Sequence, residues 1–394
     1  MGKPHAVVVP FPAQGHVRPL VELSHRLVDL GICFATVPDG LEPENDRSDL
    51  RRLCIIAALL VAKKMGVPGV GFWPASSGLL ALSPLVPKLI ESGTIHSNGE
   101  SIIQNQIIQL SPTMPEINTN NLWWNCYSDP MTRKFSFKVI SKVVEAVTLV
   151  DEILCNSFAG IEAPALGLIP KAIPIGPLLS TNRTVSKPVG NFWAEDPSCL
   201  TWLHQQQDCS VIYVAFGSLA ILNQTQFEEL AAGLEQTGRP FLWVVRPNLI
   251  SESPVVYPED FLNRVENRGK IVSWAPQQEV LCHRAVACFV SHCGWNSTTE
   301  GLSNGVPFLC WPNEADQFFN QKYICEVWKI GFELKPNEDG IITLREIQGR
   351  VEALLCDEGI RRRAVEMKEM AESSCRISVQ NLCDFVERIK NKTN

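Results

Sequence analysis

Residues 286–303 read VACFVSHCGWNSTTEGLS. The first six are apolar or small, which predicts a buried β-strand over 286–291. The residues from His292 to Gly294 predict a sharp turn, and a helix is expected to start at Trp295. A strand that runs through a tight turn into a helix is the building unit of α/β folds, whose ligands bind beside the carboxyl ends of the strands. The stretch therefore predicts an α/β protein with a ligand site at this turn.

The same order of strand, loop and helix recurs along the chain. Near the start, strands over 5–11 and 32–37 flank a predicted helix that Gly31 ends. In the second half, a helix over 224–236 lies among apolar runs that predict strands. These runs cover residues 211–216, 240–246, 271–274, 307–311 and 330–334. Such alternation predicts parallel sheets covered by helices on both faces.

A proline-rich polar stretch divides the chain in two. Five prolines fall between residues 170 and 197, and the polar run 180–186 lies among them. At roughly 150 residues per domain, a length of 394 residues suits two or three domains. We expect a first domain over 1–178, a linker over 179–196, a second domain over 197–377 and a last helix over 378–394 that packs back on the first domain.

The composition excludes several classes of protein. A net charge of −7 argues against a nucleic-acid binder, because such proteins neutralise phosphates with clustered lysines and arginines. The longest apolar run covers only residues 53–62, whereas a membrane-spanning helix needs about 20 residues, so we expect no membrane span. The first residues lack the apolar core of a signal peptide, and the 14 cysteines form no CxxC pair. Both features indicate a cytoplasmic protein with reduced thiols.

The turn at His292 has the features of an anion site. A helix N-terminus beside Gly294 offers backbone N–H groups to a diphosphate, with Asn296 and Ser297 as further donors. Glu300 lies one turn further along the same helix face, where ribose hydroxyls can donate to its carboxylate. The combination predicts a nucleotide site, although Asn296 and Ser297 taken singly also suit a plain helix cap.

Two other kinds of ligand fit the sequence less well. Cysteines and histidines gather between residues 282 and 293, but metal-ligand spacing is absent and Cys288 falls in the predicted buried strand. We therefore expect no zinc or other metal. The loop at Gly15 lacks the second and third glycines of a dinucleotide fingerprint, which disfavours an NAD-dependent oxidoreductase.

Residues 274–317 resemble the signature box of plant UDP-glycosyltransferases, and the similarity extends over nearly the whole chain, including residues 11–16. The resemblance implies the GT-B architecture, with an acceptor-binding Rossmann-like domain over 1–178 and a UDP-sugar-binding one over 197–377. It also implies a donor site made of Ser218, Trp274, Ala275, Gln277, His292, Gly294, Trp295, Asn296, Ser297, Glu300, Asp316 and Gln317.

The resemblance assigns a role to each part of this set. Trp274 stacks on uracil, Glu300 binds the ribose, and Asp316 together with Gln317 binds the sugar hydroxyls. Trp295 and Gln317 are similar to the residues of glucose-using members. The implied reaction moves glucose from UDP-glucose, with inversion, to a hydroxyl or carboxyl of a small plant metabolite. It uses no cofactor, and we expect a monomer.

His16 is the general base that the resemblance implies. It lies at the expected start of the first helix, where the positive helix end favours the neutral imidazole that a base requires. In the family, an aspartate orients this histidine, following a segment similar to residues 54–57. Here Ala58 follows that segment at once, so the aspartate is absent.

The first domain is therefore abridged around residues 38–58, where several tens of family positions are missing. The sequence at the join predicts a single helix that starts at about Asp49, is capped by Ser48 and ends before Gly66. Its apolar residues are expected on one face: Leu50, Leu53, Ile56, Leu60 and Val61.

The missing aspartate implies slow transfer, unless Asp39, Asp46 or Asp49 replaces it. A catalytically inactive UDP-sugar-binding protein, or a truncated gene product, is the alternative, and an oxidoreductase is a weaker one. Trp123 and Trp124 suit either an aromatic acceptor cleft or the core.

Overall fold

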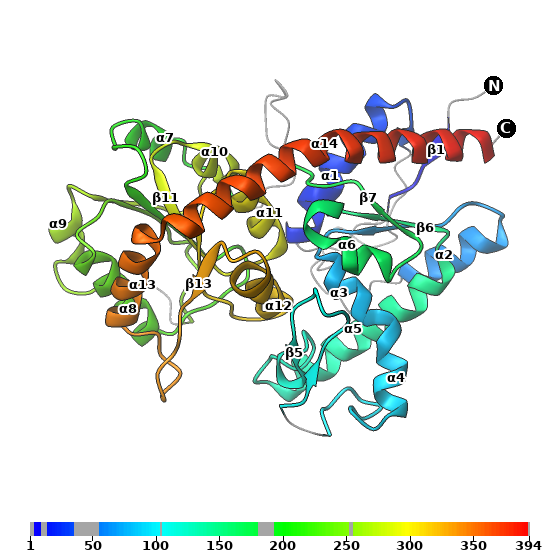
Figure 1. The fold of residues 1–394 in the computed structure, drawn as a ribbon, viewed down its shortest axis with the longest axis horizontal. Coiled ribbons are helices and arrows are strands. Elements are labelled where there is room, and N and C mark those ends of the chain that lie inside the picture. Colours follow the sequence, from blue (N-terminus) through cyan, green and yellow to red (C-terminus); the bar gives the residue numbers. More distant parts are fainter. Residues whose placement is uncertain are drawn as a thin grey trace, which may run out of the picture. The chain divides into compact units, whose positions relative to one another are not determined.

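The computed structural model describes residues 4–8, 14–34, 55–102, 105–179, 193–251 and 255–392. The chain groups into two compact units (Figure 1). The first unit consists of Met1–Phe192 and Glu372–Asn394, and the second unit of Trp193–Ala371. No described helix is long and apolar enough to cross a membrane.

The first unit contains short parallel sheets and surrounding helices. The strands β1 (His5–Ala6) and β2 (Cys33–Phe34) pair with each other, and β3 (Val70–Trp73), β6 (Glu152–Cys155) and β7 (Ala172–Pro174) form a three-stranded sheet. A small antiparallel pair joins β4 (Ile107–Ile108) and β5 (Ile117–Asn118). The helices are α1 (Gln14–Asp29), α2 (Ile55–Lys64), α3 (Ser77–Leu82), α4 (Val86–Glu91), α5 (Pro130–Leu149) and α6 (Ala159–Gly167).

The start of the first unit departs in detail from the sequence prediction. Of the strand predicted over 5–11, only His5 and Ala6 are strand among the described residues, and residues 9–11 lie outside them. The strand predicted over 32–37 begins at Cys33, and its residues 35–37 likewise lie outside the description.

The helix predicted at the join is confirmed over Ile55–Lys64, and Gly66 follows it with φ +67°. Its cap at Ser48 and its start at Asp49 lie outside the described residues. Of the five residues predicted to share one apolar face, Leu60 and Val61 are 42% and 54% exposed, and Leu50 and Leu53 lie outside the described residues. The helix packs beside α5, and the side chain of Leu59 lies against Gly69 instead.

Trp124 belongs to the core of the first unit. Its side chain is 0% exposed, its indole N–H donates to the carbonyl of Gly99 at 3.0 Å, and its ring meets Phe137 edge-on at 5.7 Å. Trp123 lies beside it, with 6.2 Å between the ring centroids. The structure thus favours the core alternative for Trp124.

The second unit is built on one six-stranded parallel sheet, as the strand and helix alternation predicts. Its order is β10 (Gly269–Val272), β9 (Phe241–Val244), β8 (Val211–Ala215), β11 (Val286–Ser291), β12 (Phe308–Cys310) and β13 (Gly331–Glu333). The chain adds β9 and β10 on one side of β8 and then crosses to β11 on the other side. Ligands of open α/β sheets bind at such a switch point, beside the carboxyl ends of the two central strands.

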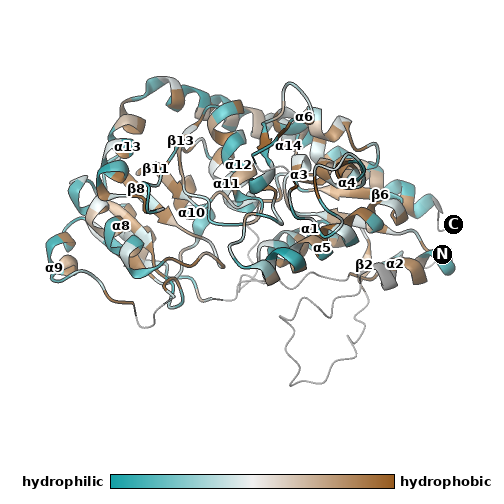
Figure 2. Cartoon of the chain, turned by 90° about the horizontal axis from the view of Figure 1, so that it is seen from below, coloured by the Kyte–Doolittle hydropathy of each residue, from teal (hydrophilic) through white to brown (hydrophobic). Residues whose placement is uncertain are grey.

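Helices precede, connect and follow these strands. They are α7 (Ser198–Leu203), α8 (Gln224–Gln236), α9 (Phe261–Val265), α10 (Gln277–Cys282), α11 (Trp295–Ser303), α12 (Gln317–Lys322) with a π-helical turn over Tyr323–Val327, and α13 (Leu344–Cys356). In Figure 2, α8 and α13 carry hydrophobic and hydrophilic residues on different faces. Their apolar faces join Trp243, Phe241 and the neighbouring strands in a common core.

The last helix, α14 (Glu358–Lys392), begins in the second unit and ends in the first. In the first unit, Ser378 donates to the carbonyl of Gly176 at 2.5 Å and Asn381 donates to that of Pro174 at 2.8 Å. Leu382, Phe385 and Val386 share a hydrophobic cluster with α1 and the strand ends. The last turns of the helix are thus packed on the first unit (Figure 1).

Candidate functional site

The turn after β11 is tightly packed around His292. A Cβ atom on Gly217, which follows β8, or on Gly294 would lie 2.5 Å from Nε2 of His292. Gly217 also has φ +63°, a conformation that favours glycine. Cys293 adopts φ +64°, and its N–H donates to the hydroxyl of Ser291 at 3.1 Å. The imidazole is therefore held beside two glycines at the switch point.

Helix α11 presents its N-terminus at this turn. Gly294 is its N-cap residue and has no side chain to cover the helix end. The helix's own hydrogen bonds begin with Thr298 N–H to the carbonyl of Gly294 at 2.9 Å, so the N–H groups of residues 295–297 point out of the helix end. A glycine-bordered helix end of this kind suits an anion.

A hydrogen-bonded network lies one turn further along α11. Gln277 donates through Nε2 to Glu300 at 2.6 Å and to the hydroxyl of Ser297 at 2.9 Å. Gln278 donates to the other carboxylate oxygen of Glu300 at 2.9 Å, and the Tyr213 hydroxyl donates to Gln277 Oε1 at 3.1 Å. The structure thus brings together three predicted residues, Gln277, Ser297 and Glu300. Tyr213 and Gln278 are additions that the sequence did not predict.

Trp274 and Ala275 precede α10. The ring of Trp274 is half-buried and packs against Trp193, with 4.9 Å between centroids and 31° between planes. Its backbone carbonyl accepts from the N–H of Asp196 at 2.9 Å, and Ala275 is buried. Trp193 was not predicted. It packs against Trp274 from the first residue of the second unit.

The last residues of the 274–317 segment form a second hydrogen-bonded cluster. Gln317 Oε1 accepts from the N–H groups of Asn313 and Glu314, at 2.8 and 3.1 Å. Asn320 donates through Nδ2 to Asp316 and to the carbonyl of Cys293, both at 2.9 Å. Asn320 therefore ties Asp316 to the turn at His292.

Two further predicted residues have different surroundings. The side chain of Trp295 is buried, with its ring centroid 6.4 Å from that of Trp328, so its backbone rather than its ring lies at the helix end. Ser218 is half-buried in the loop after β8, next to Gly217.

The histidines of the predicted sites are neutral at pH 7. Burial, followed by the positive charge of Arg246, lowers the pKa of His292 to about 4. In the first unit, His16 is the third residue of α1 and is half-buried, and burial lowers its pKa to about 4 as well. The possible substitutes for the lost aspartate, Asp39, Asp46 and Asp49, lie outside the described residues.

Burial raises the pKa of Asp316 to about 6, with hydrogen bonding from Asn320 as an opposing cause. The folded pKa is thus above the unfolded value, so the ionised carboxyl destabilises the fold at neutral pH, and this cost disappears as the pH falls through 6 toward 4. We expect Asp316→Asn to raise the free energy of unfolding at pH 7.5 by on the order of 1–3 kcal/mol.

Thermal unfolding of both proteins across pH 4 to 8 tests this. The difference in Tm should shrink toward pH 4, where the carboxyl of the folded wild type is protonated and the cost of ionising it in the fold is almost gone. A stabilisation that does not change with pH would contradict the assignment.

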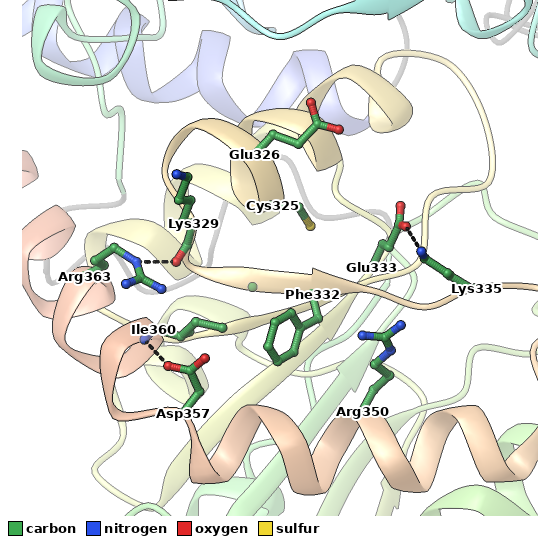
Figure 3. Close-up of a pocket in the computed structure, with 11 residues that line it drawn as sticks. Cys325, Glu326, Lys329, Phe332, Glu333, Lys335, Arg350, Asp357, Ile360 and Arg363 are labelled. Atoms are coloured by element: carbon green, nitrogen blue, oxygen red, sulfur yellow. Dashed lines mark hydrogen bonds and ion pairs between the residues drawn. The ribbon is translucent and has the colours of Figure 1, made fainter.

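A pocket of about 400 Å³ lies elsewhere in the second unit, beside β13, α13 and the start of α14 (Figure 3). Several of its charged groups are already engaged: Lys335 pairs with Glu333 at 3.1 Å, and Arg363 donates to the carbonyl of Lys329 at 2.7 Å. None of the predicted site residues lines it. Within the described ranges, no group of three His, Cys, Asp or Glu side chains could hold a metal ion.

Comparisons with known proteins show the family of the chain. Residues 83–369 match the family described as UDP-glucoronosyl and UDP-glucosyl transferase. The chain is 36% identical to UDP-glycosyltransferase 83A1 of Arabidopsis thaliana, over 100% of this chain and 98% of the relative. It is 31% identical to (R)-mandelonitrile beta-glucosyltransferase of Prunus dulcis, over 94% of this chain and 93% of the relative.

Among solved structures, a UDP-glucosyltransferase from Polygonum tinctorium superposes with a TM-score of 0.83 at 25% identity, covering 99% of both chains. The alignment with the Arabidopsis relative extends over 468 positions, although this chain has 394 residues. Several tens of positions of that alignment therefore have no residue here. The α/β fold of GT-B type is confirmed, and the chain belongs to the plant UDP-glycosyltransferase family.

Proposed function

We propose that this glycosyltransferase moves glucose from UDP-glucose to a hydroxyl or carboxyl of a small plant metabolite, with inversion and with His16 as general base. The observation that carries the proposal is the Gln277–Glu300–Ser297 network beside the open N-terminus of α11. The Glu300 carboxylate can accept hydrogen bonds from ribose hydroxyls, and the N–H groups of the helix end, one turn away, can bind a diphosphate. A related transferase from Siraitia grosvenorii, 25% identical with a TM-score of 0.77, was solved in complex with UDP.

The donor would be held by the second unit and the acceptor by the first. We assign the uracil to Trp274 and Ala275, with Gln277 as a contact to the uridine. The diphosphate is assigned to Ser218, His292, Asn296, Ser297 and the helix end at Gly294 and Trp295. Asp316 and Gln317 would bind the sugar hydroxyls. The neutral His292 offers the phosphates a hydrogen bond rather than a charge.

In the proposed reaction, the acceptor oxygen attacks the anomeric carbon while His16 takes the acceptor's proton. The bond between that carbon and the diphosphate oxygen breaks, and UDP leaves with the electron pair. Helix N–H groups aimed at the diphosphate would stabilise its developing charge. The neutral state of His16 suits this role.

The acidity of the acceptor is expected to control the rate, because no aspartate follows residues 54–57 to assist His16. We expect turnover to fall at least tenfold from benzoic acid to phenol, and again to benzyl alcohol, since acidic groups depend least on a base. The three acceptors share one ring, so their size is matched. UDP release and product mass are the measurements, and equally brisk rates on all three would show that another group has replaced the aspartate.

An inactive UDP-sugar-binding protein is the alternative outcome of the same experiment. It would show a melting temperature that rises with UDP but no acceptor-dependent release of UDP from any of the three compounds. The monomeric state and the cytoplasmic location stay predictions, and size-exclusion chromatography tests the first of them.

A further inference from the structure

Arg246 is a buried cation at the carboxyl end of β9, two residues beyond Val244. Its side chain is 1% exposed. Nε donates to the carbonyl of Gly217 at 3.0 Å, and one terminal nitrogen donates to Asn248, at 2.9 Å to its carbonyl and 2.7 Å to its side-chain oxygen. The other terminal nitrogen donates to the carbonyl of Ala220. All of these acceptors are neutral.

The guanidinium forms no ion pair with any carboxylate that the structure describes. Burial lowers its pKa to about 10, so it stays protonated at neutral pH. The charge of Glu314 acts on Arg246 through space and raises the pKa of the guanidinium, against the effect of burial. Burial raises the pKa of Glu314 in turn, and the charge of Arg246 opposes that rise. A buried charge without a close counter-charge destabilises the fold, so such a group is expected to have a functional role.

The position of Arg246 indicates what this role is. Two of its three carbonyl contacts, Gly217 and Ala220, lie on either side of Ser218, so the side chain fixes the loop that follows β8. Gly217 in turn lies against His292, whose pKa the Arg246 charge helps to lower. The cation thus lies behind the loop and the turn to which we assign the diphosphate.

We propose that Arg246 is a positioning residue for the donor: it fixes the 217–220 loop and supplies a preformed positive charge that the diphosphate neutralises when it binds. The proposal rests on the donor site described under the proposed function. It accounts for two features together, a buried charge that forms no ion pair with a carboxylate of the described residues and a neutral His292 at an anion site. The nucleotide's phosphates would provide a close counter-charge.

The experiment separates the charge from the hydrogen bonds. Arg246→Gln removes both the charge and most of the loop contacts, whereas Arg246→Lys keeps the charge and loses most of the contacts. Arg363→Gln is the matched control, because Arg363 also donates to a backbone carbonyl of the second unit but lines the pocket in Figure 3. For each protein, titration calorimetry measures the affinity for uridine, UMP and UDP, and thermal unfolding measures stability.

We expect Arg246→Gln to weaken the binding of UDP about fivefold, to weaken that of UMP by a smaller factor and to weaken that of uridine less than twofold. Arg246→Lys should recover most of the affinity that Arg246→Gln loses for the phosphate-containing ligands. Arg363→Gln should bind all three as the wild type does. An equal loss for all three ligands would overturn the proposal and leave only a structural role. If Arg246→Gln does not fold, Arg246→Lys gives the test. An equal loss of affinity for uridine and UDP in that variant also overturns the proposal. Wild-type protein that binds no UDP would instead overturn the donor site itself.

Discussion

Replacing His16 by alanine is expected to lower acceptor-dependent turnover by about 10²–10⁴-fold, the contribution that a positioned general base usually makes. His16 is in the first turn of α1, and burial lowers its pKa to about 4. Because the folded pKa lies below the ordinary value of 6.5, the imidazole is neutral over the whole range above about pH 5. It can therefore accept a proton without first losing one.

The pH profile distinguishes this base from an ordinary histidine. At saturating UDP-glucose, kcat/KM for the acceptor should stay flat from pH 8 down to about 5, without the fall near 6.5 that an unperturbed histidine would cause. Saturation with the donor removes from this parameter any effect of the Asp316 titration, near pH 6, on donor binding.

His25→Ala is the matched control, since His25 lies on the same helix and is also half-buried. It should keep its turnover, and both variants should show the wild-type rise in Tm with UDP. Turnover above half the wild-type level in His16→Ala would mean that another group removes the proton or that none is needed.

The sheet of the second unit could be predicted in detail because its signals are local. The strand over Val286–Ser291 and the helix over Gln224–Gln236 appear with the predicted bounds. Six buried residues in a row mark a strand covered on both faces, and Asn223 caps the helix by accepting from the N–H of Gln226. Such features need no knowledge of distant residues.

The first unit was less predictable, because its details depend on what packs against what. The helix Ile55–Lys64 was expected from its cap, apolar spacing and terminal glycine, but Leu60 and Val61 of its apolar face are exposed. Leu59 lies against Gly69, a contact set by the neighbouring strand and by α5 rather than by the helix's own pattern. Helical periodicity alone could not choose between neighbouring faces there.

In the donor-site network, too, residues near one another in sequence could be predicted and residues from distant segments could not. Gln277, Ser297 and Glu300 lie within one box, so a shared motif and helical spacing point to them together. Tyr213 and Trp193 reach the box from distant segments, and only the folded sheet shows their contacts. Arg246 did leave a signal, namely a charge directly after the apolar run 241–245, but that signal does not say which residues it binds.

Replacing Glu300 by glutamine is expected to raise KM for UDP-glucose roughly 10- to 100-fold, since hydrogen bonds to a charged group contribute about 1.5–3 kcal/mol. Glu300 is 4% exposed, and its two oxygens accept from Gln277 and Gln278. A glutamine would turn one of these acceptors into a donor that faces another donor. We expect kcat to change little, because the ribose is bound alike in the ground and transition states.

Removing the ribose hydroxyls separates recognition from structure. If Glu300 accepts hydrogen bonds from them, Glu300→Gln should weaken UDP strongly but 2′,3′-dideoxy-UDP only slightly, because that ligand has nothing to donate. Glu352→Gln on α13 is the matched control, an exposed glutamate that also accepts from a glutamine side chain, that of Gln348 at 3.1 Å. It should bind both ligands as the wild type does. An equal loss for the two ligands in Glu300→Gln would mean that the carboxylate only holds Gln277 and Gln278 in place, and that the ribose is recognised elsewhere.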